Sequence, residues 1–184
     1  MDQITREINA ESDLLDFAKK LKEDSYDKIE KLCTSILSQV LVLEARENAQ
    51  RTSQYLLTCR DIANRIEGYI MTRKDRYLPY LEELSEKVRD QHNCSECSGG
   101  CKINHDMQVM ELKASAATIK SILGTLQTAV LPLYSDTVYP DSYRVLRNQM
   151  ALLEDSMAEL FLLEENYLMP KVIQAQKAIN AGNK

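Results

Sequence analysis

Residues 26–43 read YDKIEKLCTSILSQVLVL, and the spacing of their apolar side chains decides the fold class. Apolar side chains recur there every three or four residues, at Tyr26, Ile29, Leu32, Cys33, Ile36, Leu37, Val40 and Leu43. This spacing lines one face of an α-helix, whereas a half-buried strand would alternate apolar and polar residues. The stretch therefore predicts a long amphipathic helix with a broad apolar face.

The rest of the chain carries the same helical signal. Leu, Ile, Met, Ala, Glu, Lys and Gln dominate the composition, and these residues favour helix. Only five glycines and four prolines interrupt 184 residues. A chain of this length is most simply one domain with a substantial core. We therefore predict a single all-α domain over residues 1–184.

Long amphipathic segments with short connections predict an up-and-down bundle of four core helices, with one additional N-terminal helix. Residues 1–50 would hold the N-terminal helices, and residues 51–180 would form the core. Asp24 and Ser25 mark the expected break after the first helix, and Pro79 and Pro170 the expected bends in later ones. Residues 44–54 are compatible with either a turn or a continuous helix.

The charge balance and the terminal sequences restrict the classes of partner. A net charge of −5 argues against a nucleic-acid-binding protein, which normally shows a basic face. The cluster around Arg73 and Lys74 is expected to be a solvated helix face. No apolar run approaches the ~20 residues of a membrane span, and the N-terminus lacks a signal-peptide pattern. We expect a cytoplasmic protein that binds neither nucleic acid nor membrane.

Residues 92–105, HNCSECSGGCKINH, concentrate soft metal ligands in one helix connection. This segment holds both histidines of the chain and three of its five cysteines. Cys94 and Cys97 form a C-x-x-C pair, Cys101 follows four residues later, and His105 or His92 could supply a fourth ligand. A Cys₃His set suits structural zinc, and three close cysteines with a remote ligand suit an iron–sulfur cluster. We predict a metal site here, with zinc and an iron–sulfur cluster as the alternatives.

Two other interpretations of the connection remain open. The C-x-x-C pair could cycle as a redox-active dithiol, or the connection could carry no chemistry. The two remaining cysteines, Cys33 and Cys59, fall on apolar helix faces and are expected to be core residues. The chain contains no glycine-rich phosphate loop and no nucleophile motif, and Glu-x-x-His, which ferritin-like di-iron sites require, is also absent.

Two patches resemble the hemerythrin-like (HHE) domains, especially their iron–sulfur cluster repair group. Residues 163–170, LEENYLMP, resemble the L-E-N-N-x-L-F-P ending of these domains. Residues 78–88, LPYLEELSEKV, resemble the L-P-x-L-x-x-L-x-x-K-V helix of the repair group, and Gln91-His92 falls at the family's V-H-G turn. The resemblance implies a four-helix bundle that would bind two irons in its interior through histidines and bridging carboxylates.

The ligands that this resemblance requires are mostly absent from the chain. Glu164 matches the family's carboxylate, but Leu160 stands where a ligand histidine would lie. Tyr69 and Asp75 occupy the approximate positions of the family's paired histidines. The usual di-iron centre therefore cannot form, and Glu164 is expected to be a structural or solvent-facing carboxylate.

These observations support three functional hypotheses. The first is a metal- or cluster-binding bundle whose site is the connection, acting in redox sensing or metal handling. The second is a degenerate hemerythrin-like bundle without metal, which binds a partner protein or a second copy through its N-terminal helices and the apolar face of residues 32–43. The third, by family analogy alone, is an oxygen- or nitric-oxide-reactive di-iron protein.

Overall fold

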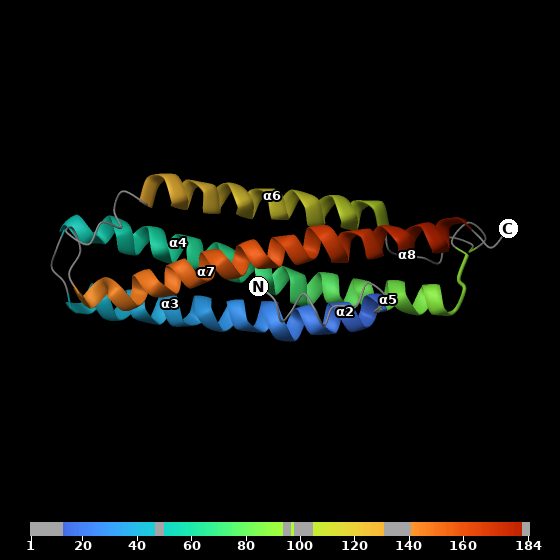
Figure 1. Cartoon of the computed structure of the whole chain (residues 1–184), viewed down its shortest axis with the longest axis horizontal. Helices are drawn as coiled ribbons and strands as arrows, with labels where there is room; N and C mark the ends of the chain where they lie inside the picture. Colours follow the sequence, from blue (N-terminus) through green and yellow to red (C-terminus); the bar gives the residue numbers. More distant parts are fainter. Residues whose placement is uncertain (1–12, 47–49, 94–96, 98–104, 131–140, 182–184) are drawn as a thin grey trace.

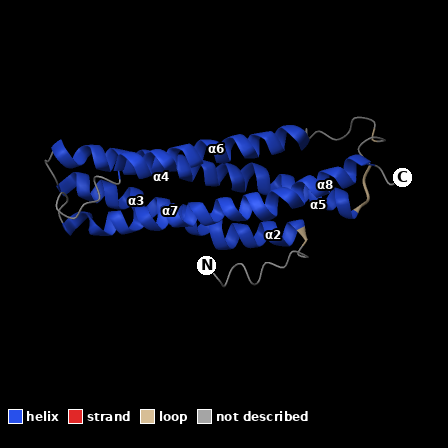
Figure 2. Ribbon diagram, turned by 45° about the horizontal axis from the view of Figure 1, so that its top comes forward, coloured by secondary structure: helices blue, strands red, loops and turns tan. Residues whose placement is uncertain are grey.

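The computed structural model describes residues 13–46, 50–93, 97, 105–130 and 141–181. Every regular element in these ranges is helical, which confirms the all-α prediction for the described part of the chain (Figure 2). None of these helices is both long enough and apolar enough to cross a bilayer.

The described residues form four long helical segments that lie side by side along one axis (Figure 1). The first comprises α2 (Leu14–Leu21), the π-helical turn η1 (Lys22–Tyr26) and α3 (Asp27–Arg46). The second comprises α4 (Gln50–Thr72), the π-helical turn η2 (Arg73–Tyr77) and α5 (Leu78–Arg89). The third is α6 (His105–Val130). The fourth begins with the 3₁₀ turn η4 (Asp141–Tyr143) and continues through α7 (Arg144–Leu163), the π-helical turn η5 (Glu164–Leu168) and α8 (Met169–Ala181).

The core lies where these segments face one another. α3 packs against α4 and α7, α4 also contacts α6, and α5 packs against α2 and α8. The apolar stripe of residues 26–43 is buried as its spacing predicts, since Ile29, Cys33, Ile36, Val40 and Leu43 are almost inaccessible to solvent. Leu32 and Leu37 are partly buried against the same core.

The segment left open by the sequence, residues 44–54, is not one continuous helix. Glu44 near the end of α3 forms an ion pair with Arg60 of α4. Sixteen residues of continuous helix would separate these positions by about 24 Å, at 1.5 Å per residue. α3 and α4 are therefore folded back on each other, with the three residues 47–49 between them lying outside the described part of the chain.

The break predicted at Asp24–Ser25 is wrong, because the backbone continues as a π-helical turn from α2 into α3. The amide of Asp27 donates to the carbonyl of Lys22, five residues earlier. Tyr26 and Ser25 are buried at this turn. The polar pair at Asp24–Ser25 thus marks a wider turn within a helix rather than a helix end.

Pro79 and Pro170 each follow a π-helical turn, which explains how the helices continue past them. The amide of Leu78 donates to the Arg73 carbonyl, and the amide of Met169 donates to the Glu164 carbonyl, both five residues back. Proline lacks an amide donor and its ring crowds the carbonyl four residues earlier in an α-helix. The wider π register relieves this conflict, so each proline lies in the first turn of the helix that follows.

Candidate functional site

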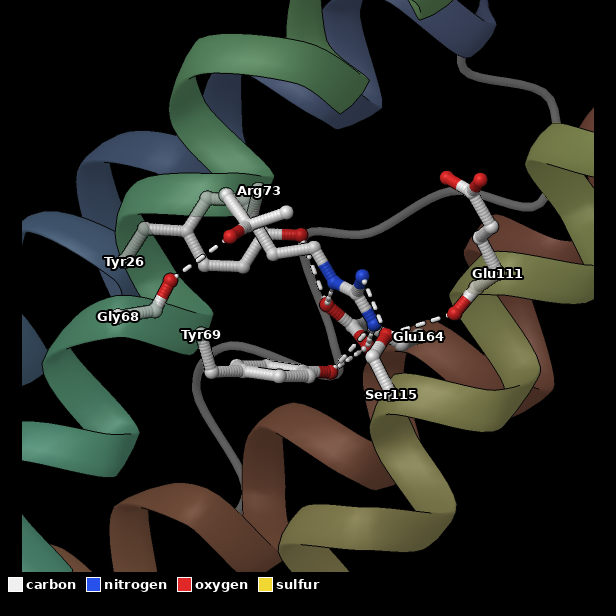
Figure 3. Close-up of polar contacts among 8 residues, drawn as sticks. Tyr26, Gly68, Tyr69, Arg73, Glu111, Ser115 and Glu164 are labelled. Atoms are coloured by element: carbon white, nitrogen blue, oxygen red, sulfur yellow. Dashed lines mark hydrogen bonds and ion pairs between the residues drawn. The ribbon is translucent and has the colours of Figure 1, made fainter.

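The three π-helical turns surround a buried ion pair between Arg73 and Glu164 (Figure 3). Arg73 begins η2 and is fully buried, and Glu164 begins η5 with only 4% of its surface exposed. The Arg73 Nε atom lies 3.0 Å from Glu164 Oε1, and Nη2 lies 3.3 Å from Oε2. The guanidinium therefore binds the carboxylate with two donors, the strongest geometry for such a pair.

Two buried tyrosines complete the hydrogen bonding of Glu164. The Tyr26 hydroxyl donates to Oε1 at 2.8 Å, and the Tyr69 hydroxyl donates to Oε2 at 2.7 Å. The carboxylate thus accepts four hydrogen bonds, which matches its capacity. We call Tyr26, Tyr69, Arg73 and Glu164 the buried Arg–Glu cluster.

The Arg73 guanidinium is held on its other sides by aromatic rings and by α6. The central carbon of the guanidinium, Arg73 Cζ, lies 4.2 Å from the centre of the Tyr69 ring and 4.7 Å from the centre of the Tyr77 ring. Tyr69 is one helical turn before Arg73 and Tyr77 one helical turn after it. Such cation–π contacts strengthen when the charge is desolvated. Nη1 also donates to the Ser115 hydroxyl of α6 at 3.1 Å, so the cluster connects α6 to the bundle.

Burial and the charge of Glu164 raise the pKa of both tyrosines in the cluster. For Tyr26 and for Tyr69, burial is the largest cause, followed by the neighbouring carboxylate. Burial is the largest single influence on the pKa of Arg73 and lowers it, but the charge and hydrogen bonds of Glu164 together with the two tyrosines outweigh burial, so the net direction is upward. At neutral pH the cluster therefore holds protonated hydroxyls and a permanently charged guanidinium.

The interior does not fit the di-iron centre that the resemblance implies. Both oxygens of Glu164 are fully engaged by hydrogen bonds, and a guanidinium lies where added positive charge would be repelled. Leu160 is buried but has no polar group that could bind a metal, and Asp75 is exposed rather than directed into the interior. The expectation of a solvent-facing Glu164 is wrong, and its structural alternative agrees with the observed contacts.

Sequence reasoning missed Arg73, because its charged neighbours suggested a solvated helix face. A usable signal was its register. Arg73 lies four residues after Tyr69 and four before Tyr77, on the stripe that also contains Ile66 and Ile70. An arginine centred on an apolar stripe needs a buried partner, and Glu164 supplies it.

The predicted Cys/His site begins where α5 ends. The Gln91 amide donates to the Val88 carbonyl and the His92 amide to the Lys87 carbonyl, which closes the helix C-terminus. Gln91 has a positive φ of 52°, a left-handed conformation that non-glycine residues adopt at a cost of about 1 kcal/mol. This turn sends the chain towards α8, where His92 lines a cavity of about 70 Å³ with Ala178 and Ile179.

Of the five predicted ligands, the structure describes the side chains of His92 and Cys97. Both are half-buried, and the Cys97 amide donates to the Asn93 carbonyl at 3.2 Å. Cys94 and Cys101 lie outside the described residues, as does the side chain of His105 at the start of α6. Among the side chains that are described, no group of three or more potential ligands comes together.

The two helical cysteines are core residues, as predicted. Cys33 and Cys59 have no exposed surface, and burial raises the pKa of each thiol to about 12. A metal ligand or nucleophile must be a thiolate, which neither becomes near neutral pH. Among the cysteines that the structure describes, only Cys97 is accessible.

This difference predicts the reactivity of the thiols. At pH 8, a thiol with a pKa of about 12 is ionised in about one molecule in ten thousand. The native variant Cys94→Ser/Cys97→Ser/Cys101→Ser should therefore react with a chromogenic aromatic disulfide reagent at least about 100-fold more slowly than the unmodified protein. The same variant unfolded in urea should release two equivalents of chromophore at once. Rapid labelling of the native variant would contradict the burial of Cys33 and Cys59.

No protein-family model, no curated protein and no solved structure matches this chain.

Proposed function

We propose that this chain is a metal- or iron–sulfur-binding helical bundle whose site is the connection from His92 to His105. The observation that carries the proposal is the accessible thiol of Cys97, which lies in a bend eight residues beyond the end of α5. The sequence places two further cysteines within four residues of it, in a segment with both histidines. Thiolates spaced in this way chelate zinc or an iron–sulfur cluster.

The contrast with the bundle interior supports the same assignment. The cationic group that neutralises Glu164 is the Arg73 guanidinium, so this carboxylate has no capacity left for a metal. We infer a hemerythrin-like, up-and-down four-helix arrangement in which an ion pair has taken the structural place of the family's interior centre. A cytoplasmic setting, where thiols stay reduced, suits such a site. Redox sensing or metal handling is the corresponding role.

Anaerobic purification followed by elemental analysis and a visible absorption spectrum tests the proposal. We expect about one zinc per chain without colour, or iron with acid-labile sulfide and visible bands. The variant Cys94→Ser/Cys97→Ser/Cys101→Ser should lose the metal or cluster completely. Cys33→Ala, which removes a buried thiol, is the matched control and should retain it.

Two results would contradict the assignment. The first is metal that remains bound in the triple variant at the stoichiometry of the unmodified protein, particularly two irons per chain, which would return the site to the bundle interior. The second is metal-free protein after anaerobic purification and after incubation with zinc or with ferrous iron and sulfide. That result would favour the second hypothesis, in which the bundle binds no metal and instead binds a partner protein or a second copy.

A second candidate, binding of a partner protein or a second copy, is favoured by exposed apolar side chains. Leu41 and Val42 of α3 are 61% and 43% exposed, and Val145 and Leu152 lie exposed on α7, which packs against α3. Scattered exposed apolar residues are ordinary, but a contiguous set marks a contact surface. Sedimentation analysis of the protein against Leu41→Glu/Val42→Glu tests it: a dimer that dissociates in the variant supports self-association.

A further inference from the structure

A cavity of about 250 Å³ opens beside the buried Arg–Glu cluster, between α6 and the junction of α7 with η5. Its wall is largely apolar, formed by Ala116 and Ala117 of α6 with Phe161 and Met169. The small side chains on α6 leave the space that a larger residue would fill. Glu164 also lines the cavity, so the cavity borders the buried Arg–Glu cluster directly.

The charge around the cavity indicates the kind of ligand. Lys113 and Lys120 of α6 both line it. Lys120 is fixed by an ion pair with Glu165 at 2.8 Å and lies 5.4 Å from the centre of the Phe161 ring. Lys113 makes no ion pair among the described residues. Arg73 neutralises Glu164, and Glu165 neutralises Lys120. Among the described residues that line the cavity, Lys113 is therefore the charge without an opposite partner.

We propose that this cavity binds a small organic carboxylate with an aromatic or compact aliphatic body. The body would lie against Phe161, Met169 and the two alanines, and the carboxylate would pair with Lys113. A dry apolar cavity of about 150 Å³ accommodates benzene, so 250 Å³ suits a one- or two-ring acid. Glu164 already accepts four hydrogen bonds, so it needs no donor from the ligand. The proposal is independent of the metal site.

The chain offers a closely matched pair of variants for the test. Ala117 and Ala114, three residues apart on α6, are both exposed, but only Ala117 lines the cavity. Ala117→Phe should fill the cavity, whereas Ala114→Phe should place the same ring in solvent. Lys113→Gln removes the proposed anion partner, and Lys31→Gln on exposed α3 surface is its control.

The experiment measures binding of 2-naphthoate to the full chain by fluorescence, excited beyond the tyrosine absorption because the protein has no tryptophan. We expect saturable binding of one probe per chain. Ala117→Phe should weaken it at least about tenfold and Lys113→Gln about fivefold, a loss typical of a charge-assisted contact at a partly exposed site. Both control variants should stay within about twofold of the unmodified protein. The neutral 2-naphthylmethanol should bind as weakly as the acid binds to Lys113→Gln.

Several outcomes would overturn the proposal. These are absence of saturable binding, equal binding by Ala117→Phe, and equally tight binding of the alcohol, which would remove the carboxylate from the ligand class. Circular dichroism and thermal melting establish that each variant is folded. If Ala117→Phe fails to fold, the comparison of Lys113→Gln with Lys31→Gln tests the proposal, because both substitutions are on the surface. Equal affinity of these two variants for 2-naphthoate would overturn it.

Discussion

Arg73→Met is expected to lower the free energy of unfolding by about 3–5 kcal/mol, the usual cost of leaving one member of a buried ion pair without its partner. The substitution removes both guanidinium donors from Glu164 and the contacts with the Tyr69 and Tyr77 rings. Glu164 would then remain in the interior with hydroxyl donors only. Urea-induced unfolding at pH 7, followed by far-UV circular dichroism, measures the change.

A matched arginine in the same π-helical turn provides the control. Arg76 pairs with Glu111 at 3.2 Å, and its side chain is 58% exposed. Arg76→Met should change the stability by less than about 1 kcal/mol, as for other surface pairs. In the double variant Arg73→Met/Glu164→Gln, we expect at least half of the Arg73→Met loss to be recovered, since no buried charge remains. Equal effects of Arg73→Met and Arg76→Met would show that the buried pair does not form.

The stability of the protein should fall steeply in alkaline solution, in two stages. Cys33 and Cys59 have folded-state pKa values raised to about 12, and burial raises those of Tyr26 and Tyr69 above the ordinary range. A raised folded-state pKa means that the unfolded chain releases its proton first. The stabilisation is therefore complete below the unfolded pKa and is lost as the pH rises.

The unfolded pKa values set the pH window of each stage. The thiols ionise in the unfolded chain above about pH 8.5, and the tyrosines above about pH 10. Each group contributes a slope of about 1.4 kcal/mol per pH unit, so two thiols give about 2.7 kcal/mol per unit between pH 9 and 10. The slope should steepen above pH 10, when Tyr26 and Tyr69 also ionise on unfolding. Urea unfolding at half-unit intervals from pH 8 to pH 11 measures it.

Two sets of variants separate the stages. Cys33→Ala/Cys59→Ala should flatten the dependence below pH 10, and Tyr26→Phe/Tyr69→Phe should flatten only the part above it. Tyrosinate absorbance of the native protein provides a direct check, because Tyr26 and Tyr69, whose pKa values burial raises, should ionise only as the chain unfolds. A stability that stays constant up to pH 10 would contradict the burial of the two thiols.

The helices were predictable from the sequence because burial of one face imposes a period on apolar residues. The stripe from Tyr26 to Leu43 is buried as this period requires. The local signal at Asp24–Ser25 failed, because the helix continues there where a break was expected. A π-helical turn stands at that place and directly before Pro79 and Pro170, and no residue pattern specified these turns. These turns depend on packing between segments distant in the sequence.

The buried Arg–Glu cluster likewise could not be predicted from local sequence patterns. The sequence singles out Glu164 as a match to a family carboxylate and Tyr69 as a residue at the position of a family histidine. It does not show that the two bond to each other, or that Arg73 and Tyr26 complete the cluster. The partners of Glu164 lie 91 to 138 residues away along the chain. No periodic pattern encodes such a contact. In contrast, the Cys/His connection is visible because its cysteines and histidines lie close together in the sequence, and the structure adds the accessibility of Cys97 and the turn at Gln91.

X-ray absorption spectroscopy at the metal edge of the anaerobically loaded protein tests the central claim most directly, since it identifies the atoms bound to the metal. For zinc, the assignment to Cys94, Cys97 and Cys101 predicts a first shell with three cysteine sulfurs at about 2.3 Å. For an iron–sulfur cluster, it predicts a first shell of sulfur around each iron, supplied by cysteine and by inorganic sulfide. The Glu164→Gln variant should give the same spectrum, because the buried carboxylate takes no part. A first shell of only oxygen and nitrogen, or a spectrum that changes with Glu164→Gln, would place the metal in the bundle interior and contradict the account.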